Sequence, residues 1–161
     1  MRLTFVTILL WLSNWSLLHA GQFETEQLSF RRLGGAQGLS QSVIRCIVQD
    51  RTGYMWFGTQ DGLNRFDGYT FSVYRHDPES ASSLPNNSIA AIYEDHNGTL
   101  WIGTSGGGLS RRNAKGSGFL TYQHSLAIPN SLSDNTISFI YEDRSNVLWI
   151  GTEFGGLDKF D

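Results

Sequence analysis

The stretch that decides the fold is residues 95–109, which read DHNGTLWIGTSGGGL. A polar turn sequence, Asp-His-Asn-Gly, is followed by a short apolar run centred on Trp101 and then by a glycine-rich loop. The aspartate of such a turn can accept backbone hydrogen bonds, and its glycine can take a positive φ. A β-branched and aromatic run bounded by turn residues is typical of a β-strand. The stretch therefore predicts a tight turn that leads into a strand over residues 99–104.

The same pattern occurs three times along the chain. Trp101 follows Trp56 by 45 residues and precedes Trp149 by 48 residues, and each tryptophan begins a Trp-x-Gly-Thr sequence. The three extra residues of the longer interval fall in glycine-rich stretches, where loops tolerate insertions and strands do not. A period of this length indicates a repeat architecture. The residues that recur in register are Asp50, Asp95, Asp143, Trp56, Trp101, Trp149, Gly58, Gly103 and Gly151.

Each repeat predicts four short strands. In the second repeat these are residues 89–94, residues 99–104, a strand that starts at Leu109, and residues 119–122. Four strands in about 45 residues is the pattern of a propeller blade. The predicted fold class is therefore all-β, a partial β-propeller of about three four-stranded antiparallel blades after an N-terminal signal peptide. Helical repeats are excluded because the segments are too short and too β-branched, whereas a seven-stranded β-sandwich stays open as an alternative.

The repeat boundaries divide the chain into predicted blades. Blade 1 covers residues 38–82, blade 2 covers residues 83–130, and an incomplete blade 3 covers residues 131–161. The segment before them, residues 21–37, contains Phe30-Arg31-Arg32-Leu33, which has the Phe-x-x-large apolar spacing of the fourth strands. It is predicted to be a closing strand, which in a closed propeller completes the last blade and protects its edge. Because three blades leave open sheet faces, residues 21–161 alone are expected to be poorly stable.

The first twenty residues differ from the rest. Arg2 provides a positive start, residues 3–12 are apolar, and His19-Ala20 precedes Gly21. This pattern predicts a secretory signal peptide over residues 1–20, with cleavage after Ala20. The alternative is a buried helix or an uncleaved anchor, but the apolar run is shorter than the ~20 residues of a membrane span. An exported protein is therefore predicted.

The composition favours a folded β protein and argues against nucleic acid as a partner. Hydrophobic residues make up 40% of the chain and charged residues 17%, which is too apolar for a disordered chain. The formal net charge is −3, and the sequence has no basic stripe. Cys46 is the one cysteine, so no internal disulfide can form, and a small buried side chain is its expected role.

The series Leu-x-x-x-x-Ile, Asp-x-x-Gly, Leu-Trp-Ile-Gly-Thr and Gly-Gly-Leu resembles the two-component regulator propeller repeat over about residues 28–161. That repeat forms the periplasmic sensor region of bacterial signalling receptors. The resemblance implies a periplasmic ligand-sensing propeller of an inner-membrane receptor, with a small-molecule or oligosaccharide ligand. Its other partners would be the remaining propeller blades and the membrane-proximal receptor domains. Full-length members carry a histidine kinase or diguanylate cyclase domain, so a truncated or fragmentary chain without enzymatic activity is expected here.

The recurring residues are interpreted as framework and not as a site. The aspartates are expected to cap turns, because Asp-His-Asn-Gly does not supply the oxygen ligands of a Ca²⁺ loop. The tryptophans are expected to pack between blades, with sugar stacking as the alternative, and the glycines fit close backbone approach. His76 and His124 occupy equivalent places that blade symmetry separates, so no metal site is predicted. No cofactor and no catalytic residue is expected.

The parts that vary between repeats are the predicted ligand surface. Loops between strands two and three are expected to lie beside the connections between blades, at one rim of the propeller. The candidate ligand-binding residues there are Gln60, Asp61, Ser105, Glu153, Phe154, Asn87 and Asn135. An exported protein-interaction scaffold is the alternative function, because fold does not fix function. A propeller lyase or hydrolase is a third, which no His, Glu or metal constellation in the sequence supports.

Overall fold

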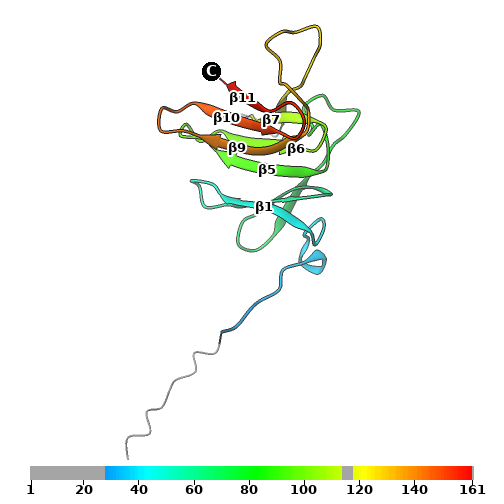
Figure 1. The fold of residues 1–161 in the computed structure, drawn as a ribbon. Helices are drawn as coiled ribbons and strands as arrows, with labels where there is room; N and C mark the ends of the chain where they lie inside the picture. Colours follow the sequence, from blue (N-terminus) through cyan, green and yellow to red (C-terminus); the bar gives the residue numbers. More distant parts are fainter. Residues whose placement is uncertain (1–27, 114–117, 161) are drawn as a thin grey trace, which may run out of the picture. The chain divides into compact units, whose positions relative to one another are not determined.

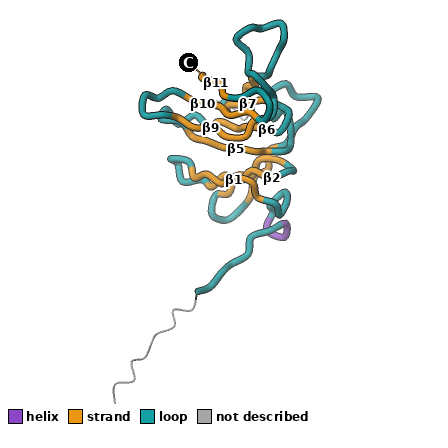
Figure 2. Tube along the Cα trace, viewed as in Figure 1, coloured by secondary structure: helices purple, strands orange, loops and turns teal. Residues whose placement is uncertain are grey.

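Short strands account for nearly all the regular structure in the computed structural model, which describes residues 28–113 and 118–160 (Figure 1, Figure 2). Residues 32–161 form one unit and residues 1–31 another, and the fold below is that of the first of these. The predicted signal peptide lies outside the described residues. The elements are the 3-10 turn η1 (Gly35–Gln37) and the strands β1 (Ile44–Gln49), β2 (Met55–Thr59), β3 (Gly62–Phe66), β4 (Phe71–Tyr74), β5 (Ile89–Glu94), β6 (Leu100–Thr104), β7 (Gly108–Arg112), β8 (Phe119–Tyr122), β9 (Ile137–Glu142), β10 (Leu148–Thr152) and β11 (Leu157–Phe160).

The strands form separate antiparallel sheets, each an up-and-down meander. The order is β1-β2-β3-β4 in the first sheet, β5-β6-β7-β8 in the second, and β9-β10-β11 in the third. The register repeats as well, because Trp56 pairs with Arg65 and Trp101 pairs with Arg111. Each sheet is one propeller blade. The all-β propeller prediction is therefore confirmed, and β5 and β8 have their predicted bounds.

The core lies between the blades. The first strands β1, β5 and β9 lie side by side, as Figure 1 shows, and alternate residues of each strand point to opposite faces of its sheet. Blade 2 therefore buries one face against blade 1 and the other against blade 3. The cluster between blades 1 and 2 contains Trp56, Leu63, Leu84, Ile89, Ile92, Leu100, Ile102 and Phe119. The cluster between blades 2 and 3 contains Ala91, Trp101, Leu109, Leu132, Ile137, Ile140, Leu148 and Ile150.

Two recurring glycines set how closely the blades approach. A Cβ built on Gly103 would lie 2.5 Å from Ile137 Cγ2 of the next blade. A Cβ built on Gly58 would lie 2.8 Å from Ile89 Cγ2. Both distances are far below van der Waals contact, so a side chain here would push the next blade away. Glycine at the centre of strand two thus allows the isoleucine of the neighbouring first strand to pack against the backbone.

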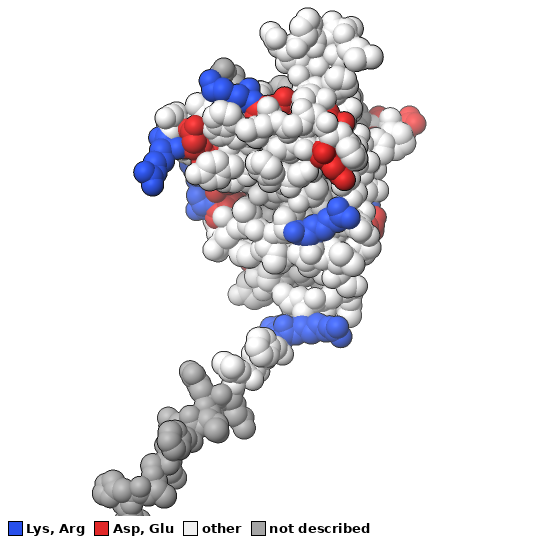
Figure 3. Space-filling view, viewed as in Figure 1, with Lys and Arg blue, Asp and Glu red and all other residues white. Residues whose placement is uncertain are grey.

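Residues 28–34 contain no strand, and Phe30 is 93% exposed. The predicted closing strand at residues 30–33 concerns a last blade that the described residues do not include, so it stays a prediction. On the face drawn in Figure 3, acidic and basic side chains are interspersed with broad uncharged areas. Among the described residues, no helix has the length and apolar character needed to cross a membrane.

Candidate functional site

Each blade has two ends at which its strands turn. At one end, called the turn end below, strand one turns into strand two through the recurring aspartates. At the other, called the loop rim, the loops between strands two and three (residues 60–61, 105–107 and 153–156) meet the connections between blades (residues 75–88 and 123–136). All the predicted ligand-binding residues belong to the loop rim.

Asn87 and Asn135 tie the loop rim together across the blades. Asn87 O accepts a hydrogen bond from Gly62 N at 2.7 Å, and Asn87 Oδ1 accepts one from His76 N at 2.7 Å. Asn135 repeats both contacts, with Gly108 N at 2.8 Å and with His124 N at 2.7 Å. Each side-chain oxygen is therefore engaged within the framework, and the amide NH₂ group of each asparagine is open to a ligand.

The rim of blade 1 carries an exposed ion pair. Arg75 Nη2 donates to Asp61 Oδ2 at 2.9 Å, and the two side chains are 47% and 44% exposed. Hydrogen bonding to Arg75 holds the pKa of Asp61 below its usual value. Gln60 is exposed beside it, and its N–H donates to Gln41 Oε1 at 3.4 Å. Gln60 and Asp61 thus present a neutral amide and a carboxylate at the rim of blade 1.

The rims of blades 2 and 3 meet around Thr136. Ser105 forms a bridge with Thr136, and Glu153 N donates to Thr136 O at 2.9 Å. Gly106 N donates to Asn135 O at 3.1 Å. The structure therefore brings Ser105, Asn135 and Glu153 together. Phe154 follows directly and is 79% exposed.

At the turn end, each recurring aspartate is bonded to the recurring tryptophan. The Trp Nε1 to Asp Oδ2 distance is 2.7 Å for Trp56 and Asp50. It is 2.8 Å for Trp101 and Asp95, and 2.9 Å for Trp149 and Asp143. The other carboxylate oxygen accepts backbone N–H groups two and four residues further on. One carboxylate thus caps the turn and fixes the indole ring.

The hydrogen bonds at the turn end keep these carboxylates ionised. Burial raises the pKa of Asp95, but hydrogen bonds from Trp101 and Thr99 outweigh it, so the pKa lies below its usual value. The hydrogen bond from Trp149 is the main cause that lowers the pKa of Asp143. The sequence reasoning missed the bond to tryptophan. Its signal was the constant spacing of six residues from aspartate to tryptophan in every repeat.

The two histidines near the ends of the fourth strands form framework hydrogen bonds, and the cysteine thiol is unreactive. His76 Nδ1 lies 2.7 Å from Leu84 O, and His124 Nδ1 lies 2.7 Å from Leu132 O. Burial raises the pKa of the Cys46 thiol to about 11, so it stays protonated at neutral pH. In residues 28–113 and 118–160, no group of three or more His, Cys, Asp or Glu could hold a metal ion.

Contacts between blades at the turn end were also missed from the sequence. Arg51 of blade 1 forms an ion pair with Glu94 of blade 2, with 3.1 Å between Nε and Oε1. At the next junction, His96 of blade 2 contacts Glu142 of blade 3, with 2.5 Å between Nδ1 and Oε1. The signal was the glutamate directly before the turn aspartate in repeats two and three.

Comparison with known proteins agrees with this geometry. Residues 38–61, 83–106 and 131–154 match the family described as two component regulator propeller. These three segments are similar to two-component regulator propeller repeats. In each match the segment begins six residues before the first strand, passes through the Asp–Trp turn and ends at the loop rim.

Solved and curated relatives place these repeats in signalling proteins. The extracellular domain of a hybrid two component system from B. thetaiotaomicron is 34% identical over 81% of this chain, with a TM-score of 0.76. Histidine kinase P4 of Formosa agariphila is 49% identical over 55 residues, which are 34% of this chain. The chain spans 18% of the first relative and 4% of the second. PorZ, a surface component of the type-IX secretion system of Porphyromonas gingivalis, shares the fold at 16% identity and a TM-score of 0.57.

Proposed function

We propose that this chain is part of an exported, ligand-sensing propeller of a two-component receptor in the inner membrane. The observation that carries the proposal is the 34% identity over 81% of the chain to the extracellular domain of a hybrid two component system. The predicted signal peptide over residues 1–20 supports export to the periplasm. The chain supplies the sensing surface, and the receptor's other domains supply the response.

The ligand, a small molecule or an oligosaccharide, binds at the loop rim. The backbone contacts of Asn87 and Asn135 hold the rim loops in place in the same way at successive blades. The side chains at the loop tips, by contrast, differ from blade to blade, and Gln60, Glu153 and Phe154 are exposed. Rigid backbone with variable exposed side chains is the usual basis of a binding surface. Ligand contact there passes a conformational change to the membrane-proximal domains.

Alanine substitutions in the complete receptor test this assignment. Gln60→Ala, Asp61→Ala, Glu153→Ala and Phe154→Ala are expected to reduce the response to ligand and to leave the melting temperature nearly unchanged. The matched control is Tyr69→Ala, because Tyr69 is 91% exposed and lies in the turn between β3 and β4, at the other end of the blade. A dose–response curve that none of the four rim substitutions alters would refute the loop rim as the ligand site.

A further inference from the structure

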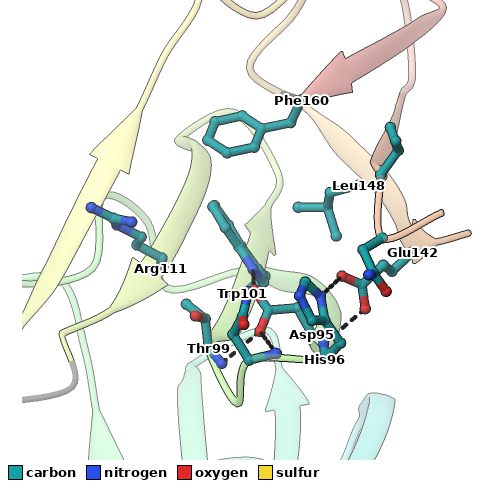
Figure 4. A pocket seen from close by; sticks show the side chains of 11 residues that line it. Asp95, His96, Thr99, Trp101, Arg111, Glu142, Leu148 and Phe160 are labelled. Atoms are coloured by element: carbon teal, nitrogen blue, oxygen red, sulfur yellow. Dashed lines mark hydrogen bonds and ion pairs between the residues drawn. The ribbon is translucent and has the colours of Figure 1, made fainter.

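A cavity of about 480 Å³ opens between blades 2 and 3 at the turn end, away from the loop rim. Trp101, Leu148 and Phe160 form its apolar wall. Figure 4 shows these side chains around one space, with Arg111 on one flank and the bonded pair of His96 and Glu142 on the other. Ligand sites in proteins occupy roughly 300–1,000 Å³ and combine apolar walls with a few polar groups. The cavity has both the size and the lining of such a site.

The corresponding space between blades 1 and 2 is filled by large side chains. Arg51 reaches across that junction, and its Nη2 donates to Asp95 O at 2.7 Å. Arg65 lies over Tyr54, with 4.5 Å between Cζ and the ring centroid. At the positions of Arg51, Tyr54 and Arg65, blade 2 carries His96, Thr99 and Arg111. At the cavity, a histidine and a threonine thus stand where blade 1 has the larger arginine and tyrosine.

Arg65 of blade 1 lies over the ring of Tyr54, but Arg111 of blade 2 has Thr99 at that position and so has no ring to cover. Within residues 28–113 and 118–160, the side chain of Arg111 makes no hydrogen bond, ion pair or ring contact. The carboxylates that line the cavity already have donors. Asp95 accepts from Trp101 Nε1 at 2.8 Å, and Glu142 accepts from His96 N at 2.8 Å and from its ring. The charged group that is open to a ligand is therefore a guanidinium, which only donates.

We propose that this cavity binds a small organic carboxylate that has a flat apolar face. The carboxylate pairs with the forked donors of Arg111, a geometry that a guanidinium matches with two parallel hydrogen bonds. The flat face lies on the wall of Trp101, Leu148 and Phe160. An aromatic acid and a uronic acid share this chemistry. Because the cavity lies at the turn end, the site is distinct from the proposed sensing surface at the loop rim.

Binding to the full chain is measured by calorimetry or by ligand-observed NMR with three probes. Phenylacetate and glucuronate carry the carboxylate, and phenylacetamide has the shape of phenylacetate without its charge. We expect at least one acid to bind, and to bind about tenfold more tightly than phenylacetamide, because a charge-assisted hydrogen bond contributes on that order. Arg111→Gln is expected to weaken that acid about tenfold and to leave phenylacetamide unchanged. Which acid binds distinguishes an aromatic ligand from a sugar acid.

Two substitutions at one position test the cavity independently of charge. Thr99→Tyr restores the residue of blade 1, fills the space and gives Arg111 a ring, so acid binding is expected to be lost while the melting temperature is kept. Thr99→Val is the matched control, because blade 3 has Val147 at this position and the space stays open. The proposal is overturned if neither acid binds, if phenylacetamide binds as tightly as the acid, or if Thr99→Tyr binds the acid normally. None of these results bears on the receptor response that tests the loop rim.

Discussion

The turn end and the loop rim of the same blades are built in contrasting ways. At the turn end one side-chain contact, from tryptophan to aspartate, recurs at 2.7, 2.8 and 2.9 Å in successive blades. At the loop rim the backbone contacts recur, but the residues at the loop tips are Gln-Asp, Ser-Gly and Glu-Phe. A repeated side-chain contact marks framework, whereas changing side chains on a repeated backbone mark a surface that can take up a function.

The cavity between blades 2 and 3 refines this distinction. It lies at the turn end, close to Asp95 and Trp101, and both of these keep their repeated contact. The neighbouring positions, His96 and Thr99, are the ones that depart from blade 1. In this repeat protein we therefore expect binding sites at positions where a side chain departs from the repeat, at either end of the blade.

The largest loss of unfolding free energy is expected when the aspartate at the turn end of blade 2 is removed. Asp95→Ala leaves Trp101 Nε1 and the N–H groups of Asn97 and Thr99 without their acceptor. The donors of Thr99 and Trp101 are part-buried and that of Asn97 is exposed. Because an unsatisfied buried donor costs about 1–3 kcal/mol, the free energy of unfolding should fall by about 3 kcal/mol in urea titrations of the full chain.

Asp61→Ala is the control at the loop rim. It removes only the exposed pair with Arg75, and exposed pairs contribute about 0–1 kcal/mol. The free energy of unfolding should therefore change by less than about 1 kcal/mol. Equal losses for Asp95→Ala and Asp61→Ala would contradict the division between framework and variable surface.

The next largest loss of stability is expected from a change in the packing between blades, which supports both the turn end and the loop rim. Gly103→Ala places a methyl group against Ile137, at a distance that forces blades 2 and 3 apart. Overpacking of this kind costs about 1–3 kcal/mol, so the melting temperature should fall. Gly35→Ala is the control, because no atom lies within 4 Å of the added Cβ. A melting temperature for Gly103→Ala as high as that of Gly35→Ala would show that the blades do not pack as described.

How much of this could be read from the sequence depends on how far apart the contacting residues lie. The bounds of β5 and β8 follow from local alternation and turn residues, and they were predicted correctly. The contacts of Arg51 with Glu94 and of His96 with Glu142 join residues 43 and 46 positions apart, so the local sequence shows the recurring glutamate but not the residue that it contacts. The cavity depends on the sizes of side chains from two blades at once. Only the three-dimensional stacking of the repeats shows which of them share a space.

A smaller effect is expected from removing the indole donor alone. Trp101→Phe keeps an aromatic ring between the blades but loses the hydrogen bond to Asp95 Oδ2. The net contribution of a hydrogen bond to a charged group is about 1.5–3 kcal/mol, part of which water can replace at this part-buried carboxylate. The free energy of unfolding should thus fall by about 1 kcal/mol, less than for Asp95→Ala. A loss as large as that of Asp95→Ala would mean that the backbone caps contribute nothing.

The smallest expected effect is a change with pH in the unfolding free energy that Trp101→Phe loses. Although burial raises the pKa of Asp95, hydrogen bonds from Trp101 and Thr99 bring it below the usual 3.8 in the folded chain. A lowered folded pKa gives stability that is complete above 3.8 and is lost as the pH falls through the folded value. Removing the Trp101 donor raises that folded pKa toward 3.8, so the variant has less of this stability to lose. The gap in unfolding free energy between wild type and Trp101→Phe should therefore be constant near neutral pH and narrow below about pH 4. A gap that widens in acid would mean that Asp95 bonds to Trp101 in its protonated form, and that the carboxylate at the turn end is not held as an ion.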